Sequence, residues 1–217
     1  MQKERVLVTG ASGFIGSNLL DYLLEKDYEV IGLSRQKNLP KIHPHLTWIR
    51  ALEELKHDRI DYVVNLAGES IAQGRWTDAR KQKLIASRVE TTTMLYQYLA
   101  KRNIQPKCII SGSAVGYYGI DPTEQWTECC NEQSAPQSIF MSELCQKWEQ
   151  SARQDTSQNT KIIRLGVVFG RGAGILPQML FPIKMNLCGR IGSGRQPVVW
   201  VHIQDVLRAI EFLMLHE

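Results

Sequence analysis

The stretch "RVLVTGASGFIG", residues 5–16, decides the fold of this chain of 217 residues. An apolar, β-branched run ends at Gly10, and Gly13 and Gly16 follow at the spacing G-x-x-G-x-x-G as a helical pattern begins. Between a strand and a helix, such glycines allow a tight turn, close approach of backbone N–H groups to a pyrophosphate, and close helix–strand packing. The helix N-terminus adds the positive end of its dipole. The loop therefore predicts dinucleotide binding, with a purely structural turn as the alternative. The expected contacts are Gly10, Ser12, Gly13, Phe14, Ile15 and Gly16.

The end of the next strand predicts which dinucleotide binds. NAD sites usually carry an acidic residue about 20 residues past the glycines, where it binds the ribose 2′-hydroxyl. Here Ser34 and Arg35 stand instead, with Lys37 close behind. A hydroxyl and a guanidinium suit a 2′-phosphate, and no carboxylate is present to repel it. We therefore expect NADP(H) to be preferred over NAD(H); the alternative is that Arg35 is an ordinary surface arginine.

Short apolar runs alternate with helical patterns along the whole chain. Strands are expected at 5–10, 28–35, 46–50, 61–68, 106–113, 160–170 and 198–203, and helices at 14–26, 78–102 and 138–150, with a last helix ending at residue 215. Nearly continuous apolar strands that alternate with helices indicate a parallel sheet covered on both faces. The expected fold is α/β: a doubly wound parallel Rossmann sheet with helices on both faces, plus a partial C-terminal substrate-side segment.

The composition of the chain changes near residue 171. We expect a dinucleotide-binding Rossmann domain over residues 1–170, an irregular substrate-side segment over 171–198, and a strand and helix over 199–217 that return to the Rossmann domain. Many glycines and prolines in the middle segment favour loops around a short helix. The chain stops after its last helix without a polar tail, so it looks truncated.

The overall composition is that of a folded protein, with 43% hydrophobic and 22% charged residues and a net charge of +4. One local basic cluster contains Arg75, Arg80, Lys81, Lys83 and Arg88. It is either a solvated helix face or a site for phosphate or carboxylate groups, and it does not favour nucleic-acid binding.

The cysteines and histidines predict neither disulfides nor a metal site. Five cysteines lack zinc-ligand or redox spacing: Cys108, Cys129, Cys130, Cys145 and Cys188. His43 and His45 have no acidic or cysteine partner at ligand spacing. Without a signal peptide or an apolar run near the ~20 residues needed to cross a bilayer, we expect a cytoplasmic protein with reduced thiols and no membrane partner.

Five motifs follow one another at spacings that fill the chain. They are "VTGASGFIGSNL" (8–19), "VVNLAGE" (63–69), "ISGSAVGYYG" (110–119), "RLGVVFG" (164–170) and "VHIQDV" (201–206). The set resembles the extended short-chain dehydrogenase/reductases, the nucleotide-sugar epimerase and dehydratase group. Together with "NLAGESIAQGRWT", "LCQKWE" and "GSGRQPVVWVHIQD", it resembles an atypical branch labelled epimerase-family, or cell-division-inhibitor-like, proteins.

The resemblance implies further cofactor contacts. The backbone of residues 65–68 would line the adenosine and ribose side, although a strand end with small packing residues is the alternative. Glu69 would face the nicotinamide half, and Arg88 falls where the broader family usually has an asparagine. The residues implied in this way are Leu66, Ala67, Gly68, Glu69, Arg88, Ser111, Gly166 and Val167.

The resemblance also implies catalytic candidates. Ser113 matches the active-site serine, whose hydroxyl hydrogen-bonds a reacting carbonyl or hydroxyl, with Ser111 as the nearby alternative. Tyr118 matches the tyrosine of a V-Y-G motif, and Tyr117 stands beside it. His202 resembles residues that mostly hold the last helix against the sheet.

The helix over 138–150 lacks a pair that the broader family carries there. That pair, Tyr-x-x-x-Lys, supplies a tyrosine acid/base and a lysine that lowers its pKa and binds the nicotinamide ribose. Its positions here are Phe140 and Leu144 in one register, or Met141 and Cys145 in the other. Neither register supplies a phenol or an ammonium group.

Two functions are therefore compatible with the sequence. We favour an NADP-dependent oxidoreductase or epimerase/dehydratase-type enzyme acting on a small hydroxylated substrate, nucleotide-linked ones included, whose proton moves through Ser113 and Tyr117 or Tyr118. The alternative is a non-catalytic NADP(H) sensor that acts through a protein partner. The resemblance also implies a homodimer through the long helices.

Overall fold

The computed structural model describes residues 3–36, 39, 41–72, 74–125, 129–171, 174–187, 189–190 and 193–216. Its main sheet contains β1 (Arg5–Thr9), β2 (Glu29–Leu33), β3 (Leu46–Ile49), β4 (Tyr62–Asn65), β5 (Cys108–Ala114) and β6 (Thr160–Leu165). All five neighbouring pairs are parallel, in the order β3-β2-β1-β4-β5-β6. The order reverses between β1 and β4, so a crevice is expected at their carboxyl ends.

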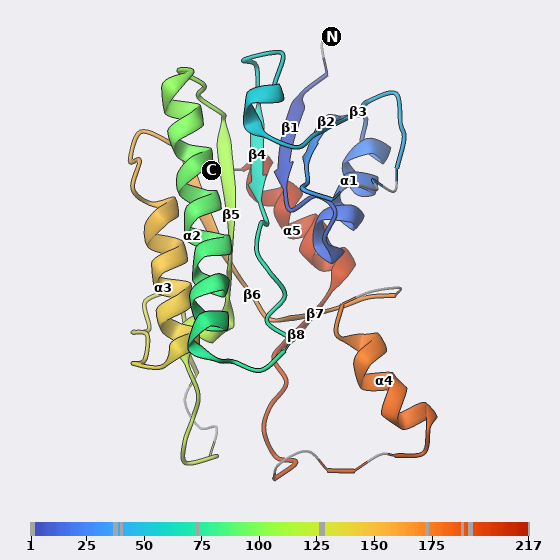
Figure 1. Ribbon diagram of the computed structural model, residues 1–217, viewed down its shortest axis with the longest axis vertical. Coiled ribbons are helices and arrows are strands. Elements are labelled where there is room, and N and C mark those ends of the chain that lie inside the picture. Colours follow the sequence, from blue (N-terminus) through green and yellow to red (C-terminus); the bar gives the residue numbers. More distant parts are fainter. Residues whose placement is uncertain are drawn as a thin grey trace.

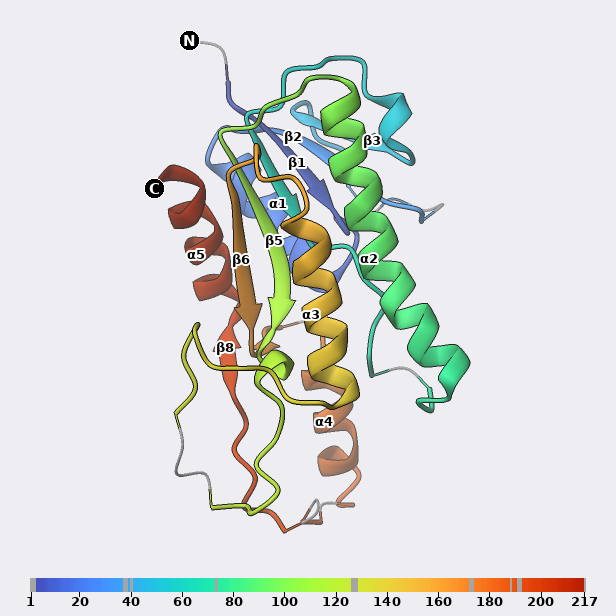
Figure 2. The same cartoon turned by 90° about the vertical axis from the view of Figure 1, so that its left-hand side faces the viewer.

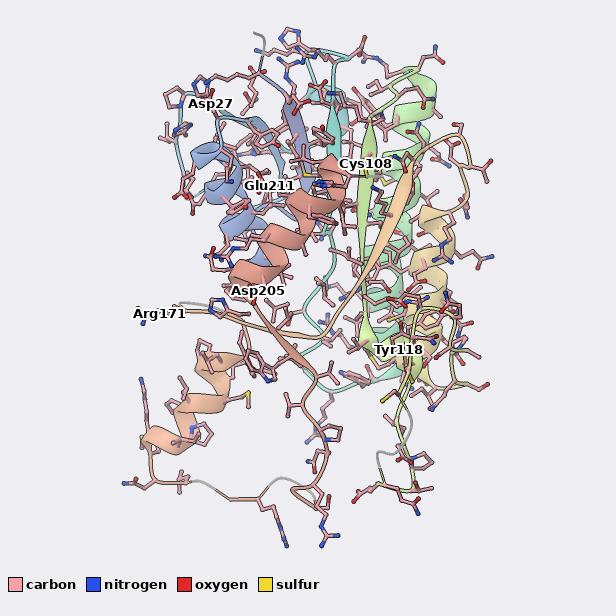
Figure 3. All side chains as sticks on the ribbon, turned by 180° about the vertical axis from the view of Figure 1, so that it is seen from behind. Asp27, Cys108, Tyr118, Arg171, Asp205 and Glu211 are labelled. Atoms are coloured by element: carbon pink, nitrogen blue, oxygen red, sulfur yellow. The ribbon has the colours of Figure 1, made fainter. Side chains whose placement is uncertain are left out.

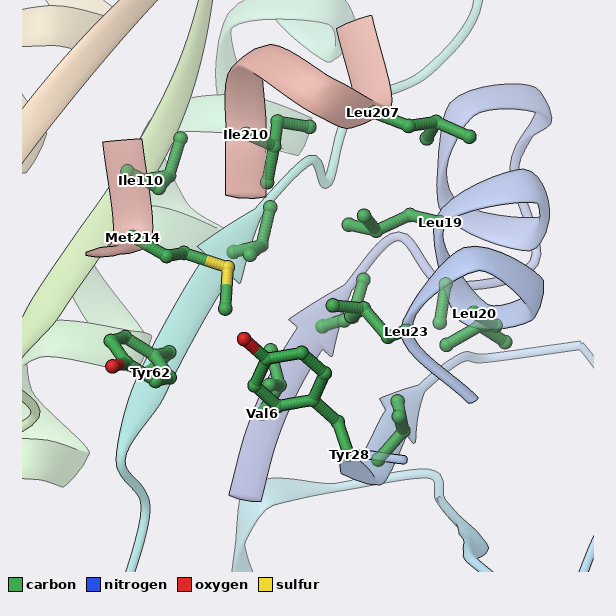
Figure 4. Packing of buried hydrophobic residues seen from close by; sticks show 14 of the residues in the cluster. Val6, Leu19, Leu20, Leu23, Tyr28, Tyr62, Ile110, Leu207, Ile210 and Met214 are labelled. Atoms are coloured by element: carbon green, nitrogen blue, oxygen red, sulfur yellow. The ribbon is translucent and has the colours of Figure 1, made fainter. Parts of the chain in front are cut away.

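Helices cover both faces of this sheet, as Figures 1 and 2 show. On one face lie α1 (Phe14–Glu25) and α5 (Ile203–Leu215), and on the other lie α2 (Asp78–Lys101) and α3 (Phe140–Ala152). Successive residues of a strand point to opposite faces of the sheet. Val6 packs in the cluster that contains residues of α1 and α5 (Figure 4), and Leu7 packs with residues of α2. The predicted doubly wound α/β fold is confirmed.

One predicted strand is divided in two. The pattern over 160–170 predicted a single strand, but the chain leaves the main sheet after β6, and β7 (Val167–Phe169) pairs in parallel with β8 (Trp200–His202). The break falls at Gly166, where a Cβ would lie 2.7 Å from the carbonyl oxygen of Val199. The close approach of the two backbones therefore requires glycine at this position.

The segment after β7 carries a single helix among its described residues, α4 (Leu176–Lys184). No residue of α4 is buried, and Figure 1 shows the helix apart from the main sheet. The chain then returns through β8 to α5, where the His202 side chain accepts a hydrogen bond from the backbone N–H of Gln204. His202 thus caps the N-terminus of α5, in agreement with its expected structural role.

Four of the cysteines are free thiols: Cys108, Cys129, Cys130 and Cys145. Cys188 and Lys37 lie outside the described residues. Among the helices of the described ranges, none has the length and apolar character needed to cross a membrane.

Candidate functional site

A cavity of about 760 Å³ opens at the carboxyl ends of β1, β2, β3 and β4, where the strand order reverses. Its volume is in the range of ordinary ligand sites. Its lining brings together nine of the residues predicted from the sequence: Gly10, Ser12, Gly13, Ser34, Arg35, Leu66, Ala67, Gly68 and Glu69. The two neighbourhoods predicted separately, the glycine loop and the end of β2, thus share one cavity.

The three glycines of the loop differ in how much space the fold leaves for a side chain. Gly10 has a φ of +65°, and a Cβ on it would lie 2.6 Å from the carbonyl oxygen of Leu66. A Cβ on Gly16 would lie far inside van der Waals contact with the Gly10 carbonyl oxygen. Gly13 has an ordinary φ of −75°, and a Cβ there would meet only the Gly10 oxygen, at 3.1 Å. The fold therefore requires glycine at positions 10 and 16, whereas at position 13 a side chain needs only a shift of a few tenths of an ångström by the Gly10 carbonyl group.

Buried hydroxyl and amide groups hold the chain after β4 in place. The Thr9 hydroxyl donates to Asn65 Oδ1 at 2.6 Å and accepts from the backbone N–H of Ala67 at 3.3 Å. Asn65 Nδ2 donates to Thr92 at 2.9 Å and to Ser111 at 3.4 Å. These groups fix the turn over 66–68 against β1. Ser111 is fully buried in this framework, behind the cavity lining.

The end of β2 is shaped by two serines. The Ser34 and Ser12 hydroxyls are 2.7 Å apart, and the Ser34 N–H donates to the carbonyl oxygen of Ile49 at 3.0 Å. Arg35 follows as an exposed residue, and Arg50, at the end of β3, also lines the cavity. Within the described residues, neither guanidinium group has a carboxylate oxygen within 4.0 Å, and Glu54 accepts only from the backbone N–H of Arg50, at 3.0 Å. Two guanidinium groups are thus available at this end of the cavity.

The other wall of the cavity comes from the segment after β3 and from α2. The lining residues to which the sequence pattern did not point include Arg50, Ala51, Leu52, Glu53, Ser87, Glu90, Thr91 and Met94. Arg50 could have been found from its place one strand end away from Arg35, once the sheet order was known. The α2 residues that line the cavity can be identified only when it is known which face of the helix points to the sheet.

The basic cluster at the start of α2 is partly neutralised. The Glu69 carboxylate accepts from Lys83, at 3.0 Å, and from Arg80. These two hydrogen bonds lower the pKa of Glu69, so the carboxylate is held in its charged form. Lys81 pairs with Asp78 one turn earlier. Three of the five basic residues of the cluster are therefore held in ion pairs, and of these pairs Lys83 and Glu69 line the cavity.

A second polar group lies at the carboxyl end of β5. The Ser113 hydroxyl donates to Glu149 Oε1 at 2.7 Å, and Arg164 binds both oxygens of the same carboxylate at 2.7 and 2.8 Å. Arg164 also donates to the Tyr118 hydroxyl at 3.0 Å and lies over the ring of Tyr117, 3.5 Å from its centroid. Figure 3 shows Tyr118 near the tip of the β5 arrow. The three catalytic candidates are thus gathered around one ion pair, outside the cavity lining.

Glu149 and Arg164 form a largely buried ion pair, with side chains 3% and 11% exposed. Burial alone would raise the pKa of Glu149, but hydrogen bonds from Arg164 and Ser113 outweigh it, and the pKa is lowered. The hydrogen bond to Glu149 raises the pKa of Arg164. The pair is therefore charged, and it holds the Ser113 hydroxyl in one orientation.

The contacts of α3 decide between the two registers left open by the sequence. A Cβ on Gly116 would lie 3.3 Å from Met141 Cε and 3.9 Å from Cys145 Sγ, so both side chains face the end of β5. Phe140 instead packs edge-on against Trp76, and Leu144 is buried in the core. Met141 and Cys145 therefore occupy the side of α3 that faces Ser113, and burial raises the pKa of the Cys145 thiol.

The remaining predicted residues lie outside the cavity lining: Phe14, Ile15, Gly16, Arg88, Ser111, Gly166 and Val167. Phe14 and Ile15 pack against the core at the start of α1. Val167 donates its N–H to the Val199 carbonyl oxygen at 2.8 Å, as part of the pairing of β7 with β8. In the described part of the chain, no three histidine, cysteine or acidic residues are grouped to hold a metal ion.

The sheet order, the glycine loop and the cavity at the topological switch point define a Rossmann-type α/β protein. The chain belongs to the NAD dependent epimerase/dehydratase family, whose model matches residues 6–217. The family resemblance predicted from the sequence motifs is confirmed.

Three relatives illustrate this membership. An epimerase family protein of Staphylococcus saprophyticus is 36% identical over 212 residues, which are 95% of this chain and 70% of that protein. The structure of human epimerase family protein SDR39U1 (isoform 2) with NADPH has a TM-score of 0.82 and 35% identity, covering 97% of this chain and 70% of that one. A nucleoside-diphosphate sugar epimerase from Corynebacterium glutamicum has a TM-score of 0.77 and 27% identity, covering 98% and 44%.

Proposed function

We propose that the protein binds NADP(H) in the cavity. We further propose that it is an oxidoreductase or epimerase/dehydratase-type enzyme that acts on a small hydroxylated substrate, a class that includes nucleotide-linked compounds. One observation carries the proposal: a single cavity joins the glycine loop to a strand end that presents Ser34, Arg35 and Arg50. Guanidinium groups are suited to a phosphate, and an acidic residue that would bind a free 2′-hydroxyl is missing from the end of β2. A similar protein, human SDR39U1, was solved with NADPH, which supports the same choice.

Each part of the cavity has a role in this proposal. Gly13 and the N-terminus of α1, which has no side-chain cap, take the pyrophosphate. Ser34 and Arg35, with Arg50 as an added partner, take the 2′-phosphate. The backbone over 66–68 lies along the adenosine side. A bound nicotinamide would supply the hydride chemistry, and the protein supplies the position and the charge around it.

Ser113 and Tyr118 are the groups that we propose for proton movement. Because the Ser113 hydroxyl donates to Glu149, its oxygen can only accept a hydrogen bond from a substrate hydroxyl. The Tyr118 oxygen accepts from Arg164, so a phenolate formed there would keep a cationic partner. This arrangement differs from a tyrosine and lysine on one helix, and we expect slow or narrowly specific turnover.

The sensor alternative rests on one observation. The three catalytic candidates surround a buried ion pair and lie outside the cavity lining, so the dinucleotide could bind without chemistry. A screen of hydroxylated and nucleotide-linked substrates, followed by nicotinamide absorbance and product analysis, separates the two. The homodimer and the cytoplasmic location stay predictions.

The Arg35→Ala variant should lose much of the preference for NADPH. Losing one charge-assisted hydrogen-bond partner costs about 1.5–3 kcal/mol, so the NADPH dissociation constant should rise roughly ten- to hundredfold. NADH carries no 2′-phosphate, and its affinity should hardly change. Fluorescence titration of both cofactors measures the difference, with Arg195→Ala, an exposed arginine outside the cavity, as the matched control. Equal losses for NADPH and NADH would remove Arg35 from the 2′-phosphate site.

We expect no measurable 4-epimerisation of UDP-glucose or UDP-galactose despite NADPH binding. The side of α3 that faces Ser113 presents Met141 and Cys145, and neither can act as the usual phenol acid/base or ammonium group. Product analysis by chromatography tests this. Rapid epimerisation that persists in Ser113→Ala and Tyr118→Phe variants would overturn the proposed proton route.

A further inference from the structure

The two oxygens of the Glu69 carboxylate are each bound by a cation from the first turns of α2. Lys83 lies 3.0 Å from Oε1, and Arg80 donates to Oε2. Arg80 also donates to the carbonyl oxygen of Ser70 at 2.7 Å, and its side chain is only 16% exposed. Because Glu69 and Lys83 line the cavity, this pair of cations forms a basic site at the cavity wall.

The basic site has more N–H donors and more positive charge than Glu69 can match. Arg80 Nε is buried and has no acceptor among the described residues. A buried donor without an acceptor is costly. Arg75, in the loop before α2, is exposed and has no carboxylate oxygen within 4.0 Å in the described part of the chain. The surplus of donors and charge suits a further group of anionic oxygen atoms.

The basic site lies at the same edge of the sheet as Ser113. Because β4 and β5 pair in parallel, with Asn65 opposite Ser111, the chain that leads to Glu69 leaves the sheet beside the end of β5. The loop before α2 also contacts the start of α3, where Trp76 packs edge-on against Phe140 with ring centroids 5.5 Å apart. A ligand that lies across the ends of β4 and β5 therefore contacts both the basic site and the catalytic candidates.

The backbone and the side chain of Glu69 are held independently. Its N–H donates to the Ser87 hydroxyl at 3.2 Å, and its carbonyl oxygen accepts from Arg88 at 2.9 Å. The carboxylate is kept charged by its two cations, whose hydrogen bonds lower the pKa of Glu69, and the side chain is 24% exposed. The carboxylate can therefore move into water while the backbone stays in place, and a ligand oxyanion can bind the two cations in its stead.

We propose that Arg80 and Lys83 form a subsite for an anionic group of the substrate, and that Glu69 fills this subsite as an internal substitute for that group. The inference rests on the proposed function and narrows its substrate class to hydroxylated compounds that carry a phosphate or a carboxylate. The subsite is separate from the cofactor 2′-phosphate, which we assign to Arg35 and Arg50 at the end of β2 and β3.

Isothermal titration calorimetry with inorganic phosphate, on protein saturated with NADPH, measures the subsite directly. The bound cofactor fills the 2′-phosphate site, so phosphate has to bind elsewhere. Glu69→Gln keeps the size of the side chain but removes its charge, and it should tighten phosphate binding at least about tenfold over wild type. Adding Arg80→Met should abolish that gain. The matched control is Asp78→Asn, which frees the exposed Lys81 and should leave phosphate affinity within about twofold of wild type.

A second arm identifies the anionic group by competition with phosphate in the Glu69→Gln protein. Glycerol 3-phosphate, glycerate and glycerol share one hydroxylated carbon skeleton and differ in charge. Competition by glycerol 3-phosphate alone assigns the subsite to a phosphate, and competition by glycerate alone assigns it to a carboxylate. Equal competition by neutral glycerol would overturn the subsite.

The outcomes separate the inference from the function on which it rests. Unchanged phosphate affinity in Glu69→Gln, an equal gain in Asp78→Asn, or a gain that survives Arg80→Met would overturn the subsite while NADPH binding by wild type stands. A wild-type protein that binds no NADPH would overturn the proposed function itself. If thermal unfolding shows that the protein with Arg80→Met is not folded, Lys83→Met replaces it and should reduce the gain.

Discussion

The Gly13→Val variant should fold like the wild-type protein and bind no detectable NADPH. A Cβ at this position meets one backbone oxygen, that of Gly10 at 3.1 Å, which must shift by only a few tenths of an ångström, and the φ of −75° suits any residue. The valine side chain would stand where we propose that the backbone meets the pyrophosphate, so binding loses both space and N–H contacts. Circular dichroism checks the fold, and fluorescence titration checks binding.

The loop offers a matched control in Gly16→Val. Its Cβ would overlap the Gly10 carbonyl oxygen, and Gly10 itself is held by the turn after β4. We expect this variant to be destabilised or unfolded, because backbone atoms and not a flexible side chain must move. A Gly13→Val protein with native circular dichroism and unchanged NADPH affinity would contradict the prediction that this loop binds the cofactor.

Breaking the ion pair between Arg164 and Glu149 should have the largest effect on stability. In Arg164→Met the Glu149 carboxylate, whose side chain is 3% exposed, keeps Ser113 and the more distant Arg153 as its only partners among the described residues. Removing one member of a buried pair costs about 3–5 kcal/mol, so the free energy of unfolding should fall by that amount. Urea denaturation followed by circular dichroism measures it.

Two variants show whether the cost comes from an unpaired buried charge. Arg102→Met removes a solvent-exposed partner of Asp58 and should change the free energy of unfolding by less than about 1 kcal/mol. Replacing both members, as Arg164→Met with Glu149→Leu, should recover much of the loss. A double variant as unstable as Arg164→Met alone would contradict this explanation.

The same pair gives a pH dependence with a definite sign. The pKa of Glu149 is lowered in the folded protein, so its contribution to stability is complete above the unfolded pKa, about 4.3 for glutamate. That contribution is lost as the pH falls through the folded pKa. The stability difference between wild type and Glu149→Gln should therefore shrink as the pH is lowered below about 4.

The parts of the fold that depend on local pattern could be predicted from the sequence. The helix expected at 78–102 is α2, whose first turn is capped by Thr77 accepting from the N–H of Arg80. The glycine loop and the end of β2 were also recognisable, because strand, turn and helix signals stand next to each other. That they meet in one cavity follows from the parallel order of the sheet.

The parts that depend on contacts between distant segments could not be predicted. Residues 160–170 read as one apolar strand, and only the pairing with β8 shows where it breaks. Arg50 lies at the end of a short strand with no motif around it, and the sheet order alone brings it beside Arg35. Glu149 resembles any polar residue of an amphipathic helix until Arg164 on β6 lies opposite it.

The measurement that tests the central claim most directly is the ratio of the NADPH and NADH dissociation constants for the unmodified protein. We predict that NADPH binds roughly ten- to hundredfold more tightly, because Arg35 and Arg50 meet a 2′-phosphate that NADH lacks. The preference should shrink as salt is added, since the contact is electrostatic and exposed. Equal affinities, tighter binding of NADH, or no binding of either cofactor would contradict the account.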